Sequence, residues 1–131
     1  LRSAEAAITR YWRVIDGAGS DPTQSLNVLA AVARSQALAQ WQTTLAEYRT
    51  KQWKQVGRSS VDDAVAVTED GKAFTVRACL DVSSLDVVDA AGKSIVVANR
   101  PAQQQYTYTV EKAPEGFFVI EDTLKGQPCD A

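Results

Sequence analysis

Cys79 and Cys129 are the two cysteines of this 131-residue chain, which contains no histidine. Zinc sites and catalytic cysteines usually rely on imidazole, so both kinds of site lack a usual partner here. The two cysteines can form a disulfide that closes a loop of about fifty residues, or they can be buried reduced thiols. The disulfide is favoured because Cys79 falls on the polar side of a strand pattern and Cys129 follows the loop-like residues 125–128. Such a bond belongs in an oxidising compartment.

Acidic residues occur as adjacent pairs at Asp62-Asp63, Glu69-Asp70 and Glu121-Asp122. Neighbouring side chains of a strand point to opposite faces, so none of these pairs forms a metal clamp by itself. The sequence also lacks the glycine-rich phosphate loops, the G-x-S-x-G nucleophile turn and the carboxylate spacing of an EF-hand. We therefore expect neither a metal site nor a bound cofactor.

The formal net charge is -2 and the isoelectric point is near 5.1. This balance argues against a general nucleic-acid binder, which needs a surplus of Lys and Arg to displace counterions from phosphate. The charge is uneven: residues 1–60 hold eight Lys and Arg against four Asp and Glu, whereas residues 61–131 hold six against twelve. This asymmetry is typical of two complementary layers, and an electrostatic docking site is the alternative.

Three helices are expected before residue 54. The first has Ser3 as its N-cap and ends at residues 16–19. The second begins at Asp21-Pro22-Thr23-Gln24, which resembles a capping box. The third has Ser35 as its cap, unless it continues the second as one bent helix. The apolar stripes of the first and third helices consist of Ala4, Ala7, Ile8, Tyr11, Trp12 and Ile15, and of Leu38, Trp41, Leu45 and Tyr48.

From Lys54 onward the apolar period changes from 3.6 to 2, which indicates strands. The first expected strand covers residues 54–68 with a break near residues 57–60. The central strand covers residues 73–82 and continues to residue 88. A third starts at residues 94–98, passes a bulge or loop at Pro101 and continues over residues 103–112. The last covers residues 117–124.

Three helices followed by four long strands predict an α+β fold. We expect the helices to pack on one face of an antiparallel four-stranded meander, with more strands if the long ones are broken. Strands of this length accumulate twist, so the sheet should curve strongly into an open cone around the helices.

This arrangement resembles the NTF2-like (cystatin-like α+β) superfamily over nearly the whole chain, as a single domain of residues 1–131. Four short pieces are similar to exported proteins and lipoproteins of actinobacteria that carry this fold: Ile8-Thr9-Arg10-Tyr11-Trp12, residues 78–83, residues 106–110 and Gly126-Gln127-Pro128-Cys129. The resemblance implies a secreted or lipid-anchored protein of the cell envelope, attached to the membrane only through a segment upstream of Leu1. These pieces are architectural, so the resemblance implies fold and export rather than an activity.

A non-catalytic binding domain is the leading functional expectation, with a small apolar ligand or a protein as its partner. A cone-shaped fold can arrange aromatic side chains around a cavity, and the candidates for its walls are Tyr11, Trp12, Tyr106 and Tyr108. Phe117 and Phe118 should point to opposite faces, which would leave one of them on the outer face of the sheet. Families resembling this one commonly form homodimers through that face.

Two alternatives stay open. Members resembling ketosteroid isomerase use a Tyr and carboxyl groups whose pKa values an apolar pocket shifts, and Tyr11 could play this part with Asp16, Asp81 or Asp122. Dehydratase-like members depend on a His that this chain lacks. The second alternative is a structural or assembly module of an envelope complex. A cavity closed by side chains would favour assembly, and a deep cavity lined by a Tyr and a buried Asp would favour the enzyme.

Overall fold

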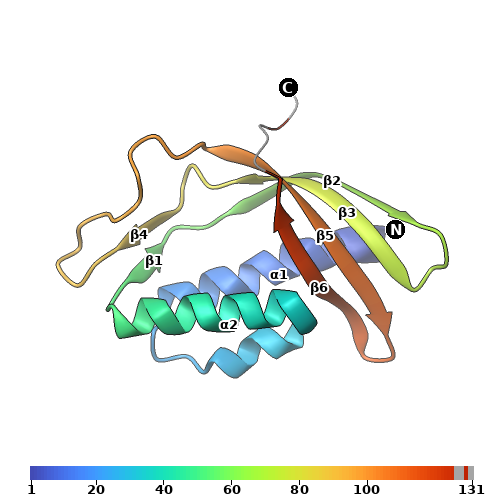
Figure 1. The fold of residues 1–131 in the computed structure, drawn as a ribbon, viewed down its shortest axis with the longest axis horizontal. Coiled ribbons are helices and arrows are strands. Elements are labelled where there is room, and N and C mark those ends of the chain that lie inside the picture. Colours follow the sequence, from blue (N-terminus) through green and yellow to red (C-terminus); the bar gives the residue numbers. More distant parts are fainter. Residues whose placement is uncertain (126–128, 130–131) are drawn as a thin grey trace.

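The computed structural model describes residues 1–125 and Cys129. Helix α1 (Arg2–Ser20) buries one apolar stripe against the sheet, and its central members Ile8, Tyr11 and Ile15 are almost completely shielded from solvent. Helix α2 (Ser35–Thr50) lies on the same side of the sheet and packs against its last strand. Figure 1 shows both helices beneath the curved sheet. Among the described residues, no helix combines the length and apolar character needed to cross a membrane.

The expected second α-helix is wrong. A 3₁₀ helix, η1 (Leu26–Ala31), takes its place, and Ser25 caps it through Asn27 N. The helix stops there because the next residues turn to the edge of the sheet, where Val119 N donates to Val32 O at 3.0 Å and Arg34 N donates to Val119 O at 2.9 Å. Backbone groups at a sheet edge need partners, and this short parallel contact provides them.

The expected serine caps are also wrong. Helix α1 begins after Leu1 and helix α2 after Arg34, and neither start has a hydrogen bond from a capping side chain. Helix α1 also continues through Gly17 and Gly19 to Ser20, beyond its expected end.

The main sheet has four antiparallel strands in the order β2-β3-β5-β6. They are β2 (Ser60–Thr68), β3 (Ala73–Asp81), β5 (Gln103–Ala113) and β6 (Gly116–Leu124). This confirms the α+β class with helices on one face of a curved four-stranded meander. The break expected at residues 57–60 is present, and it separates β2 from the short strand β1 (Lys54–Val56).

Strands β1 and β4 (Asp86–Val88) form a separate two-stranded antiparallel ribbon. The central strand therefore does not continue to residue 88 within the main sheet, because the chain turns after Asp81. The strand expected at residues 94–98 is absent from the described structure. Only Ser94 forms a bridge there, to Val88.

Strand β3 alternates as its sequence predicts. Phe74, Val76, Ala78 and Leu80 are buried against the helices, whereas Thr75 and Arg77 are exposed on the other face. The pairing extends these faces across the sheet: Ala66, Val76, Tyr108 and Asp122 form an inner row.

Two bulges determine which side chains of the edge strands, β2 and β6, face the helices. In β2 the pairing shifts between Asp62 and Val65, and in β6 Ile120 is an extra residue between the pairs Thr109–Glu121 and Val110–Val119. A bulge of one residue reverses the faces that follow it. As a result, Val65 and Val67 point outward and Asp122 points inward.

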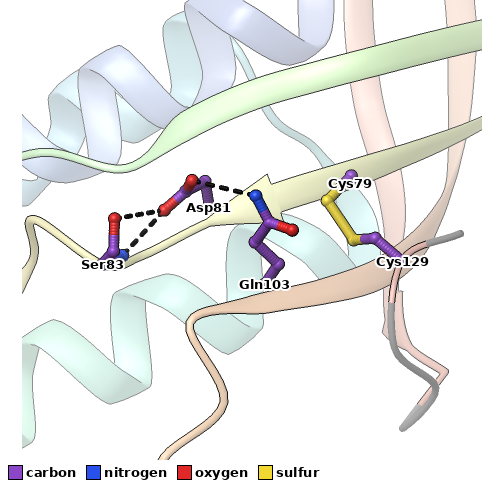
Figure 2. Close-up of a disulfide and its surroundings, with 5 residues drawn as sticks. All are labelled: Cys79, Asp81, Ser83, Gln103 and Cys129. Carbon is purple, nitrogen blue, oxygen red and sulfur yellow. Dashed lines mark hydrogen bonds between the residues drawn. A yellow bond between two sulfur atoms is a disulfide. The ribbon is translucent and has the colours of Figure 1, made fainter. Parts of the chain in front are cut away.

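Cys79 and Cys129 form the expected disulfide, with their Cα atoms 5.7 Å apart. Figure 2 shows this bond joining the chain after β6 to the outer face of β3. The piece Gly126-Gln127-Pro128-Cys129 contributed to the resemblance, and its residues 126–128 lie outside the described residues.

Candidate functional site

The four expected wall residues lie together inside the curved sheet. Tyr11 and Trp12 come from α1, and Tyr106 and Tyr108 come from β5. Trp41 of α2 completes this aromatic cluster, with its ring centroid 5.4 Å from that of Trp12. Edge-to-face contacts join Tyr11 to Tyr108 at 6.1 Å and Trp12 to Tyr106 at 5.9 Å. This geometry is favourable for aromatic pairs and fills space densely.

Asp122 is the polar centre of the cluster. Its Oδ2 accepts hydrogen bonds from Tyr11 Oη at 2.5 Å and from Trp41 Nε1 at 3.2 Å, so it joins both helices to β6. Its backbone N–H donates to Gln36 Oε1 at 2.9 Å. A second hydrogen bond of 2.8 Å, from Trp12 Nε1 to Tyr108 Oη, runs between α1 and β5.

Burial controls the protonation of this cluster. It raises the pKa of Asp122, while the hydrogen bonds from Tyr11 and Trp41 oppose that shift. Burial, followed by the nearby Asp122, also raises the pKa of Tyr11, of Tyr108 and of the half-buried Tyr106. All three tyrosines therefore keep their protons at neutral pH. Asp122 Oδ1 is buried and has no hydrogen-bond partner among the described residues.

The centre of the cluster is closed to solvent, whereas Trp41 and Tyr106 at its border are half-buried. Tyr11 and Tyr108 have no exposed surface, and Trp12 and Asp122 keep only 5% of theirs. Three clefts stand out on the described residues, and Trp12 is the one member of the cluster that borders any of them. Tyr11 and Asp122 have the chemical groups of an acid–base pair, but a substrate could reach them only if these rings moved.

The other two candidate carboxylates lie apart from Tyr11. Asp81 is at the outer end of β3, where it accepts hydrogen bonds from Ser83 and from Gln103 (Figure 2). These contacts, Ser83 first, lower the pKa of the Asp81 carboxyl group. Asp16 is buried and accepts from Gln55 Nε2 at 2.6 Å and from Ser59 N and Oγ at 2.9 and 2.8 Å.

A cleft of about 540 Å³ lies between α1 and the connection from β1 to β2. Helix α1 provides Thr9, Trp12, Arg13, Asp16, Gly17 and Ser20 to its walls, and the connection with the start of β2 provides residues 57–61. No residue of this cleft other than Trp12 and Asp16 was among the candidate residues of the sequence. The cleft's one signal was the expected break at residues 57–60 within a basic half of the chain.

The outer face of the sheet is not covered by any described helix or strand. Val65 and Val67 of β2 are 49% and 60% exposed there, next to Arg77 and Thr75 of β3. Phe117 and Phe118 alternate faces along β6 as expected, but neither is an exposed outer-face residue. Phe117 is half-buried and packs on Phe74, and Phe118 is buried with the guanidinium group of Arg34 3.7 Å from its ring centroid. In the described part of the chain, no group of three or more His, Cys, Asp or Glu side chains is arranged to hold a metal ion.

No protein-family model and no curated protein match this chain. Several solved structures, in contrast, are similar to this chain. The intermembrane space region of the chloroplast protein ARC6 superimposes with a TM-score of 0.70 at 20% identity, covering 94% of each chain. The beta subunit of the benzoate 1,2-dioxygenase of Burkholderia mallei gives 0.62 at 9% identity, covering 95% of this chain and 88% of that one. This chain has the NTF2-like fold.

The Kfla4162 protein of Kribbella flavida also has a similar structure, with a TM-score of 0.61 at 10% identity, and it matches over 94% of this chain and 90% of that chain. At such low identities the similarity establishes the fold and leaves the activity to be argued from this chain's own residues. In this chain the aromatic cluster occupies the space between the curved sheet and the helices.

Proposed function

We propose that this protein is a non-catalytic binding module that associates with protein through the outer face of its sheet. One observation carries the proposal: the interior, where an NTF2-like enzyme would bind its substrate, is filled by the aromatic cluster and tied together through Asp122. A closed interior of this kind favours the assembly role over the isomerase-type role.

The isomerase-type alternative would need Asp122 to accept a proton from a substrate. The hydroxyl group of Tyr11 already donates a hydrogen bond to Asp122, and the ring of Tyr11 is fully buried, so a substrate has no access to that carboxyl group in this arrangement. The groups present are suited to stabilising the packing of α1, α2 and β6 on one another.

The partner surface is the outer face of the sheet, and its proposed occupant is a second copy of this chain. Val65 and Val67 give it an exposed apolar strip, and Arg77 on β3 lies two strands away from Glu121 on β6. A twofold axis through this face can bring opposite charges of two copies together, as a symmetric interface requires. The beta subunit of benzoate 1,2-dioxygenase is by name part of a larger assembly, which agrees with an association role for this fold.

The disulfide supports a location outside the cytoplasm, since such bonds persist in oxidising compartments. Secretion or lipid anchoring at the cell envelope is part of the proposal. It agrees with the resemblance of the sequence to exported actinobacterial proteins.

A small apolar ligand at Tyr11, Trp12, Tyr106 and Tyr108 is the second candidate. One observation favours it: Tyr106 is half-buried and Trp12 borders a cleft, so that side of the cluster is the least enclosed. Binding there would require the rings to separate.

The association is tested by light scattering of purified protein over a range of concentrations. Val65→Lys with Val67→Lys places two charges on the proposed contact and should weaken the dimer by more than about a hundredfold. Val97→Lys is the matched control because Val97 is 67% exposed but lies in the connection between β4 and β5. Equal masses for the wild type and both variants at every concentration would refute association through this face.

A further inference from the structure

The cleft between α1 and residues 57–61 shares only Trp12 with the aromatic cluster, and none of its lining residues belongs to the proposed interface. Its volume of about 540 Å³ lies within the range of roughly 300–1,000 Å³ that is typical of small-molecule sites. It is on the helix side of the sheet, so an occupant would leave the outer face free.

Two arginines face this cleft from its two walls, Arg13 from α1 and Arg58 from the connection between β1 and β2. Both are exposed, and within residues 1–125 and 129 neither takes part in a hydrogen bond or an ion pair. Asp16 is the one acidic residue of the lining, and both of its oxygens are occupied by Gln55 and Ser59. The cleft therefore has an excess of positive charge available to a ligand.

The wall opposite α1 is fixed in place before any ligand arrives. Gly57 adopts a φ of +83°, and a Cβ atom there would lie 1.9 Å from the carbonyl oxygen of Ser84. Gly19 leaves the space that Gln55 fills, since a Cβ at Gly19 would lie 2.5 Å from Gln55 Oε1. These close contacts, together with the hydrogen bonds to Asp16, hold the connection that carries Arg58. A fixed wall lowers the entropy cost of binding.

The lining also has an apolar part and several hydroxyl groups. Trp12 and Val61 provide apolar surface, and Ser20 and Ser60 provide hydroxyls that can donate to an anion. Planar guanidinium groups bind phosphate and carboxylate oxygens well, often in pairs of hydrogen bonds.

We infer that this cleft binds a small organic anion. Arg13 and Arg58 hold its phosphate or carboxylate group, and its apolar part lies against Trp12 and Val61. This inference goes beyond the proposed association and does not depend on it, because the two surfaces lie on opposite sides of the sheet.

The test uses 1-naphthyl phosphate and the neutral 1-naphthol as probes, with isothermal titration calorimetry of the full chain. The wild type should bind the phosphate at least about tenfold more tightly than the naphthol, and added salt should reduce that difference. Arg13→Gln and Arg58→Gln should each weaken binding of the phosphate about tenfold or more, and together they should abolish the preference for it. Replacement of the naphthyl phosphate by naphthoate should distinguish a phosphate site from a carboxylate site.

Arg2→Gln is the matched control, since Arg2 is an exposed arginine of the same helix that does not line the cleft. It should bind both probes as the wild type does, and thermal unfolding should show that all variants are folded. Equal binding of the two probes, no binding up to about 5 mM, or an unchanged affinity in the double variant would overturn the inference. Light scattering of the same samples separates this result from the association, because the arginine variants should leave the dimer intact.

Discussion

Tyr11 is the residue whose hydroxyl contributes most directly to the interior. Tyr11→Phe keeps the ring but removes the donor to Asp122, so it leaves a buried carboxyl group with one side-chain donor in place of two. We expect it to lower the free energy of unfolding by about 1–3 kcal/mol, the usual cost of removing one hydrogen-bond partner from a buried polar group. Urea denaturation measures this.

Tyr48→Phe is the control for that change. Tyr48 is half-buried against Trp53, and its hydroxyl forms no hydrogen bond within the described residues. Its substitution should change the free energy of unfolding by less than about 0.5 kcal/mol. Equal losses in the two variants would show that the contact of Tyr11 with Asp122 adds nothing.

Asp122 should make stability depend on pH in an unusual direction. Its pKa in the folded state is raised by burial above the ordinary 3.8, so the folded protein holds the proton more tightly than the unfolded chain does. The stabilisation from this group is complete below pH 3.8 and is lost as the pH rises through the folded-state pKa. Relative to Asp122→Asn, the wild type should therefore become less stable between about pH 4 and pH 7.

The opposite behaviour is expected of Asp81, whose pKa is lowered by its hydrogen bonds from Ser83 and Gln103. Its stabilisation is present above pH 3.8 and lost as the pH falls through the folded-state pKa. Because this group is exposed, the effect should be small. Denaturation of both Asn variants from about pH 2 to about pH 7 checks the two signs. Parallel curves for the wild type and Asp122→Asn would contradict the account of the interior.

At the scale of elements, the connection between β1 and β2 depends on Gly57. Gly57→Ala places a Cβ against the carbonyl oxygen of Ser84 in addition to the strain of a positive φ. Gly92 has nearly the same φ, +82°, with nothing within 4 Å of a Cβ, so Gly92→Ala isolates the backbone strain. We expect about 1–2 kcal/mol of destabilisation for Gly92→Ala and a clearly larger loss for Gly57→Ala. Similar melting temperatures for the two variants would show that the contact with Ser84 relaxes freely.

The type of each element, helix or strand, was predictable where its apolar residues follow a clear period. The prediction failed where contacts with distant parts of the chain determine the local structure. Strand β3 and helix α1 follow their apolar patterns. Residues 22–33 read as a helix because their apolar spacing cannot show that Val32 and Arg34 must pair with Val119 at the edge of the sheet. The bulge at Ile120 could not be predicted from the sequence either. Without this bulge, strict alternation along β6 would point the side chain of Asp122 outward.

At the scale of the whole molecule, the sequence predicted the layers and the disulfide but only part of the site. It predicted Tyr11, Trp12, Tyr106 and Tyr108 as the walls of a ligand cavity. The structure brings their rings together, and ligand binding by them stays a prediction. Whether they surround a cavity or fill it depends on Trp41, whose indole lies against Trp12, and on the volume left between helices and sheet. The cleft lined by Arg13 and Arg58 joins segments about 45 residues apart, so no local pattern could reveal it.

The most direct test of the account is native mass spectrometry of the protein isolated from its own host, followed by denaturing extraction. We expect a dimer that carries no apolar compound, because the aromatic cluster fills the interior of the sheet. A monomer that retains one apolar molecule for each chain would contradict it, and would instead make Tyr11, Trp12, Tyr106 and Tyr108 the walls of a ligand pocket that opens.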